Sequence, residues 1–199
     1  MRGIIICGGK VGEYIKDYIK PDDFVICADS GYDRAKAFGI TPEIVIGDMD
    51  STCEKEIPFE KITYPVRKDF TDSELAVNYA KEKGFDSVLM FGMIGTRMDH
   101  SLANISLLSQ LDDAVIIDAN NEIYFADGKF TLSGKIGDTI SIIPYKEDIL
   151  VAKSKGLDYP LLNTTIKCGT TLGVSNVMTE NECEIEIEKG SAFIIRSRD

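Results

Sequence analysis

The stretch IIICGGKVG, residues 4–12, places four consecutive apolar residues directly before a run that contains three glycines. An apolar run of this length is too short for a helix and is typical of a strand that is buried on both faces. The glycines allow the chain to turn sharply where the strand ends. The stretch therefore predicts a buried parallel strand that is followed by a tight turn.

Similar runs recur along the first three fifths of the chain, at residues 24–27 (FVIC), 44–46 (IVI), 88–91 (VLMF) and 115–117 (VII). Segments with helical spacing lie between them. Two helical faces are predicted, one from Leu75, Ala76, Tyr79 and Ala80 and the other from Met98, Leu102, Ile105 and Leu108. Alternating strands and helices predict an α/β domain built on a doubly wound, mostly parallel sheet.

The pattern changes at about residue 120. Helical spacing disappears, and short strand-like runs such as residues 140–143 and 192–195 are separated by turns that contain glycine. Residues 184–188 (EIEIE) alternate strictly, as a half-exposed antiparallel strand does. The sequence therefore predicts two domains, an α/β domain over residues 1–122 and a small all-β sandwich over residues 123–199.

The composition excludes some functions. Acidic residues outnumber basic ones by 33 to 22, and the resulting net charge of -11 opposes binding to nucleic acid. The five cysteines form neither a CxxC pair nor a zinc-ligand pattern, so we expect reduced thiols in a cytoplasmic protein. We expect no targeting segment and no membrane span, since the first apolar run is too short for either.

The polar residues of interest follow the predicted strands, and in open α/β sheets ligands bind at these carboxyl ends. Glycines allow a phosphate to approach the backbone, whereas carboxylates repel it unless a divalent cation lies between them. Asp48 and Asp50 alternate at a strand end, so both can converge on one Mg²⁺ ion. The alternative is an acidic turn in which Ser51 caps a helix.

Two further segments are open to two interpretations. Thr71 and Glu74 form a capping box that predicts the start of a helix, and Asp72 in its first turn could simply complement the helix dipole. Arg97 and Asp99 could form a surface pair at another helix start, or they could bind phosphate and metal or substrate.

In order along the chain, these motifs resemble those of the thiamin pyrophosphokinase family. The resemblance rests on residues 29–31 (DSG), 39–42 (GITP), 47–51 (GDMDS), 68–72 (KDFTD), 95–100 (GTRMDH), 156–161 (GLDYPL) and 173–176 (GVSN). It covers essentially the whole chain, and its specificity comes from the order of the motifs.

The resemblance implies roles for individual residues. The metal ligands would be Asp29, Asp48 and Asp50. The nucleotide site would include Gly9, Asp29, Ser30, Lys68, Asp69, Thr71 and Arg97. Thiamin would be bound by Asp72, Asp99, Ser175 and Asn176, and the catalytic residues would be Asp50, Asp72, Arg97 and Asp99. Tyr159 would lie beside the thiazolium ring or pack within the sandwich.

It also implies an activity, in which pyrophosphate moves from Mg-ATP to the thiamin hydroxyl and yields thiamin pyrophosphate and AMP. The β-sandwich domain would bind thiamin and form a homodimer, with each active site drawing on both chains. Two alternatives remain at this point, a Mg-dependent phosphohydrolase of the haloacid-dehalogenase type and a nucleotide or thiamin sensor without turnover.

Overall fold

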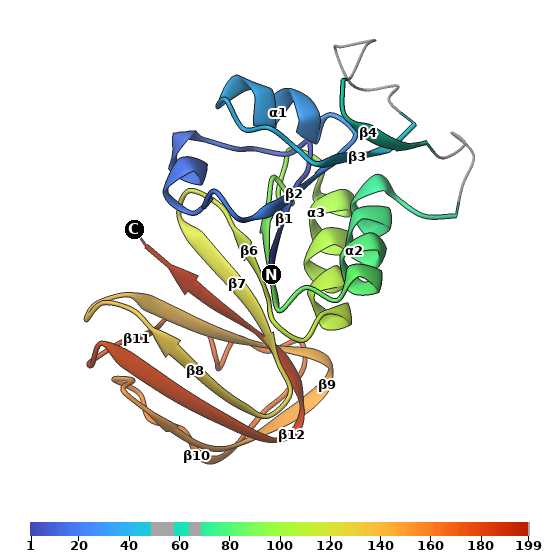
Figure 1. The fold of residues 1–199 in the computed structure, drawn as a ribbon. Coiled ribbons are helices and arrows are strands. Elements are labelled where there is room, and N and C mark those ends of the chain that lie inside the picture. Colours follow the sequence, from blue (N-terminus) through green and yellow to red (C-terminus); the bar gives the residue numbers. More distant parts are fainter. Residues whose placement is uncertain (49–57, 64–68, 199) are drawn as a thin grey trace. The chain divides into compact units, whose positions relative to one another are not determined.

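The computed structural model describes residues 1–48, 58–63 and 69–198, and the chain divides into two compact units, Met1–Ala119 and Asn120–Asp199 (Figure 1). The sequence predicted a domain boundary between residues 122 and 123, which lies inside strand β7 (Asn121–Ala126). In the structure the first unit ends at Ala119, just before that strand. No helix in the described part of the chain has both the length and the apolar character of a membrane span.

The first unit contains a parallel sheet with the strand order β6-β5-β1-β2-β3-β4. Its strands are β1 (Arg2–Ile6), β2 (Phe24–Ala28), β3 (Ile44–Gly47), β4 (Glu60–Thr63), β5 (Ser87–Phe91) and β6 (Ala114–Ile117). The predicted apolar runs form the central strands, and Ile4, Ile5 and Ile6 are fully buried. The mostly exposed β4 was not predicted, because an edge strand carries no continuous apolar run.

Helices connect these strands, and Figure 1 shows η1 on one side of β1 and β2, with α2 and α3 on the other. The helices are α1 (Gly31–Ala37), α2 (Asp72–Lys83) and α3 (Met98–Ser106), with short 3₁₀ segments η1 (Glu13–Asp17) and η2 (Leu107–Gln110). The predicted start of α2 is confirmed, because the Thr71 side chain accepts a hydrogen bond from the Glu74 N–H at 3.2 Å.

Helix α3 differs from the sequence-based prediction. Met98, Leu102, Ile105 and Leu108 were expected to share one apolar helical face, but the Met98 and Leu102 side chains are 65% and 61% exposed, whereas Leu108 is fully buried and lies beyond α3 in η2. The buried positions of α3 are Ser101 and Asn104. The predicted face is therefore exposed at Met98 and Leu102, because α3 itself turns a polar side inward, and it is buried only after the helix ends.

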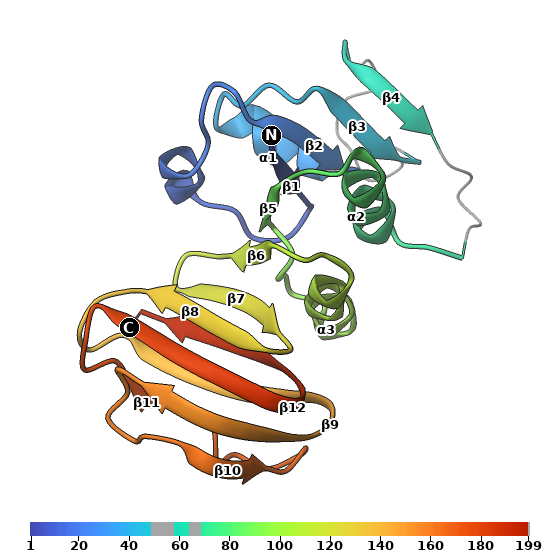
Figure 2. The same ribbon diagram turned by 60° about the horizontal axis from the view of Figure 1, so that its bottom comes forward.

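The second unit is a β-sandwich whose two layers share the long strands β9 (Thr139–Lys155) and β12 (Glu182–Ser197) (Figure 2). The amino-terminal part of β9 pairs with the carboxyl-terminal part of β12, which is flanked by β7, and β11 (Asn176–Val177) extends this layer. The remaining halves of β9 and β12 form the other layer with β10 (Leu162–Ile166) and β8 (Lys129–Ser133).

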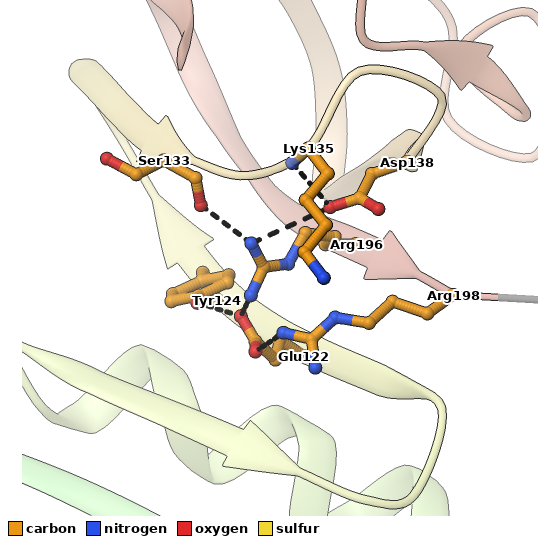
Figure 3. Close-up of polar contacts among 7 residues, drawn as sticks. All are labelled: Glu122, Tyr124, Ser133, Lys135, Asp138, Arg196 and Arg198. Atoms are coloured by element: carbon orange, nitrogen blue, oxygen red, sulfur yellow. Dashed lines mark hydrogen bonds and ion pairs between the residues drawn. The ribbon is translucent and has the colours of Figure 1, made fainter. Parts of the chain in front are cut away.

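A buried polar cluster lies within this unit and joins β7 to β12 (Figure 3). Glu122 on β7 is only 5% exposed and forms ion pairs with both Arg196 and Arg198. Tyr124 donates its hydroxyl hydrogen to Glu122 at 2.5 Å. The Arg196 guanidinium also donates to the Ser133 carbonyl at 2.6 Å. The buried charges are therefore compensated by several partners, as burial of a charge requires.

Candidate ligand-binding and catalytic site

A cavity of about 390 Å³ opens at the carboxyl ends of β1, β2 and β5 in the first unit. β1 lies between β2 and β5, so the chain changes direction across the sheet at this point. Ligands of open α/β sheets bind at such switch points. The cavity is lined by Cys7, Gly8, Gly9, Ala28, Asp29, Ser30, Thr71, Asp72, Ser73, Gly92, Met93, Gly95, Thr96, Arg97, His100 and Asn104.

The glycine run after β1 allows two backbone segments to lie in close contact. Backbone hydrogen bonds continue between the segments that follow β1 and β5. The N–H of Gly9 donates to the Gly92 carbonyl, and the N–H of Lys10 donates to the Ile94 carbonyl, both at 2.9 Å. A side chain at Gly9 would collide with the carbonyl oxygens of Gly92 and Ile94. Glycine is therefore required at position 9 for these two backbone segments to lie this close together.

The side chains of two aspartates lie beside Gly47, the last residue of β3. A Cβ atom built on Gly47 would lie 2.9 Å from Asp72 Oδ1 and 3.2 Å from Asp29 Cβ. Asp29 follows β2 with a positive φ of 47°, and its N–H donates to the Ile46 carbonyl at 2.9 Å. Its side chain is therefore held at the cavity by the backbone of the neighbouring strand, while Asp72 arrives from the first turn of α2.

The predicted metal ligands are only partly within the described residues. Asp48 is half-buried and directly follows Gly47, whereas Asp50 and the predicted nucleotide-binding Lys68 lie outside the described residues. Among residues 1–48, 58–63 and 69–198, no three His, Cys, Asp or Glu side chains are grouped so that they could hold a metal ion. The described donors beside Gly47 are therefore the carboxylates of Asp29 and Asp72, with Asp48 next along the chain.

Arg97 and Asp99 form a paired unit at the start of α3. The guanidinium contacts both carboxylate oxygens, with Nε–Oδ1 at 3.2 Å and Nη2–Oδ2 at 2.6 Å. The hydrogen bonds from Arg97, together with one from the backbone N–H of His100, lower the pKa of Asp99 to about 2. Asp99 is therefore ionised throughout the physiological range, and its carboxylate holds the largely exposed Arg97 guanidinium at the rim of the cavity.

Of the other predicted site residues, Gly9, Ser30 and Thr71 line the cavity, while Asp48, Asp69 and Asp99 are not among its lining residues. Sequence reasoning missed Cys7, Ser73, Thr96 and Asn104, which line it as well. Burial raises the pKa of the Cys7 thiol to about 12. The thiol is therefore protonated and uncharged, and it lines the cavity without acting as a nucleophile. Cys7, Ser73 and Thr96 lie within segments that the sequence analysis considered, but nothing in the sequence marked these positions themselves as part of a site.

Ser175 and Asn176 belong to the second unit. The backbone of Ser175 has a positive φ of 62°, and its N–H donates to the Ser141 hydroxyl at 3.1 Å. The Asn176 side chain binds both backbone groups of Tyr159, accepting from its N–H at 3.0 Å and donating to its carbonyl at 2.7 Å. Asn176 therefore holds the turn that presents the Tyr159 ring, which is 62% exposed.

These features define an α/β protein with an acidic, glycine-lined ligand cavity at the switch point of its sheet, followed by a β-sandwich unit. The family model "Thiamin pyrophosphokinase, catalytic domain" matches residues 15–119, and "Thiamin pyrophosphokinase, vitamin B1 binding domain" matches residues 129–192. The chain belongs to the thiamin pyrophosphokinase family.

Individual relatives agree with the family models. The chain is 35% identical to thiamine pyrophosphokinase of Bacillus subtilis, and the match covers 100% of both chains. The crystal structure of thiamine pyrophosphokinase from Bacillus subtilis superposes with a TM-score of 0.91 at 31% identity, again over 100% of both chains. That of thiamin pyrophosphokinase from Geobacillus thermodenitrificans has a TM-score of 0.90 at 26% identity, covering 100% of this chain and 98% of the other.

Proposed function

We propose that this protein is a thiamin pyrophosphokinase, which transfers the terminal pyrophosphate of ATP to the hydroxyethyl oxygen of thiamin and releases AMP. The observation that carries this proposal is the combination of both family models with a cavity at the sheet switch point, which is lined by aspartates and glycines. The phosphohydrolase alternative has less support, because the haloacid-dehalogenase arrangement needs an aspartate after the first strand and this chain has Cys7, Gly8 and Gly9 there.

Magnesium is part of the proposal. Mg²⁺ prefers oxygen ligands and is usually bound by one or two carboxylates together with substrate phosphates and water. Asp29 and Asp72 beside Gly47, with Asp48 adjacent, supply such donors, so the residues present fit the ion. Asp29, Asp48 and Asp50 would hold it, and when bound it would neutralise charge on the polyphosphate oxygens.

The protein's own groups would act mainly by positioning. Asp72 lies at the cavity and would accept the proton of the thiamin hydroxyl as that oxygen forms its bond to the β-phosphorus. The bond from this phosphorus to the oxygen bridging the α- and β-phosphates breaks, and AMP leaves with that electron pair. Arg97, at the cavity rim, would stabilise the negative charge on the transferred or leaving phosphates.

The remaining roles belong to the second unit and to assembly. Ser175 and Asn176 would hold thiamin, Asn176 in part through the turn at Tyr159. We propose a homodimer, because site residues occur in both units of the chain and sandwich edges are available for self-association. A cytoplasmic location is supported by the use of ATP and by the free thiols Cys7, Cys27, Cys168 and Cys183.

The reaction can be tested directly with purified protein, thiamin, ATP and Mg²⁺, followed by chromatography of nucleotides and thiamin esters. We expect AMP and thiamin pyrophosphate in equal amounts. ADP as the main product would contradict pyrophosphate transfer, and phosphate release without thiamin would favour the phosphohydrolase. Binding of both substrates without turnover would favour the sensor.

The metal site can be tested with Asp48→Asn. We expect its activity to fall by about tenfold or more and its Mg²⁺ requirement to rise, because loss of a direct ligand should cost at least as much as loss of an outer-shell partner. Asp22→Asn is the control, since this exposed carboxylate lies before β2, at the opposite end of the strand from the cavity. Wild-type turnover with unchanged Mg²⁺ dependence in Asp48→Asn would remove this residue from the site.

A further inference from the structure

Helix α3 buries polar side chains although it carries exposed apolar ones. Ser101 and Asn104 are only 3% and 6% exposed, one turn apart on the helix. Buried polar groups are costly unless they are hydrogen-bonded, so their burial at this place requires partners. Those partners all lie in one short segment, residues 92–97, which connects β5 to α3.

The contacts to this segment are specific. Asn104 donates from Nδ2 to the Met93 carbonyl at 2.7 Å, and both residues are buried. The Ser101 hydroxyl accepts a hydrogen bond from the Gly95 N–H at 3.1 Å and donates to the Arg97 carbonyl at 2.9 Å. Two side chains of α3 thus hold backbone groups near the start, middle and end of the connecting segment.

The same segment forms one wall of the cavity. Gly92, Met93, Gly95, Thr96 and Arg97 all line it. The side chain of Arg97 is exposed, but its carbonyl accepts hydrogen bonds from both the hydroxyl and the backbone N–H of Ser101. The backbone that carries Arg97 is therefore fixed even though the guanidinium is at the rim.

We propose that Ser101 and Asn104 are positioning residues, which act through segment 92–97 to place Arg97 and the adjoining backbone against the phosphates of the bound nucleotide. This inference rests on the proposed function for the identity of that ligand. Neither side chain needs to react. Their effect follows from the steep dependence of catalysis on the placement of charge-stabilising groups.

The experiment compares Ser101→Ala and Asn104→Ala with a matched control on the same helix. Ser106 makes the same kind of bond as Ser101, from its hydroxyl to the Leu102 carbonyl at 3.0 Å, but it is only half-buried and this bond stays within the helix, so it holds no backbone group of segment 92–97. We expect kcat/KM for ATP to fall about ten- to a hundredfold in the Ser101 and Asn104 variants, with a raised KM for ATP. Ser106→Ala should behave as the wild type, and Ser101→Thr, which keeps the hydroxyl, should recover most of the activity.

A merely structural role predicts a different result. Partial unfolding lowers the amount of active enzyme and therefore kcat, but it leaves the KM for ATP of the folded molecules unchanged. An unchanged KM for ATP in both Ala variants would therefore overturn the proposal, as would an equal effect of Ser106→Ala. If Asn104→Ala does not fold, Ser101→Ala and Ser101→Thr decide the question.

Failure of the proposed function would be recognised separately. If the wild-type protein makes no thiamin pyrophosphate, the proposed reaction is contradicted. Nucleotide binding at the cavity can still be measured, by calorimetric titration with a non-hydrolysable ATP analogue. Weaker binding of this analogue by Ser101→Ala than by Ser106→Ala would support the positioning role. Equal affinities of these two variants and the wild type would overturn it.

Discussion

At the scale of single residues, the absence of a side chain at Gly47 allows the side chains of Asp29 and Asp72 to lie against the end of β3. In Gly47→Ala, the added methyl group would come within 2.9 Å of Asp72 Oδ1, and the flexible carboxylate would move before the backbone does. We expect activity to fall strongly. Because Gly47 has a φ of 147°, we also expect a stability loss of about 1–3 kcal/mol, measured by denaturant unfolding.

Gly39→Ala separates these two effects. Gly39 also has a positive φ, 72°, but a Cβ atom there would meet nothing within 4 Å. This variant should lose about 1 kcal/mol of stability through backbone strain and keep wild-type kcat. If Gly47→Ala is as active as Gly39→Ala, the position of the Asp72 carboxylate does not matter for the reaction.

At the scale of elements, strands β7 and β12 are joined by the buried cluster around Glu122 (Figure 3). Glu122→Gln removes the negative charge that faces Arg196 and leaves a buried guanidinium without its main partner. We expect the free energy of unfolding to fall by about 3 kcal/mol, because breaking a buried pair exposes the full desolvation cost of the remaining charge. Thermal or urea unfolding measures this loss.

Glu184→Gln is the control for this prediction. Glu184 on β12 faces Lys129 and Lys155 at 3.6 and 3.7 Å, and both lysine side chains are about two-thirds exposed. Such surface pairs contribute about 0–1 kcal/mol. Equal losses in the two variants would mean that the Glu122 cluster contributes no more than a surface ion pair.

At the scale of the whole molecule, the proposed homodimer predicts that each active site uses residues of two chains. Asp72→Ala and Ser175→Ala proteins should each be inactive, but subunit exchange would create mixed dimers with one doubly defective site and one intact site. With equal parents and random exchange, activity should return to about a quarter of the wild-type value, by symmetry. Native mass measurement confirms that mixed dimers have formed. If these remain inactive, each site is built within one chain.

The α/β character and the change to an all-β unit could be predicted from sequence, because both depend on local patterns. The apolar runs at residues 4–7, 24–27 and 44–46 have the length and composition of buried strands wherever they lie in the sheet. The start of α2 could also be predicted from a local pattern, since Thr71 and Glu74 of its capping box are three residues apart. The family resemblance followed from the order of such motifs and required no contact between them.

The tertiary structure alone decided which residues meet. Asp29 and Asp72 are far apart in the chain and converge beside Gly47 only because β2, β3 and the start of α2 are neighbours in space. The burial of Ser101 and Asn104, and the exposure of Met98 and Leu102, depended on a segment whose backbone groups needed partners. Hydrophobic periodicity identifies the apolar side of a helix, but the surface that the helix meets determines which side is buried.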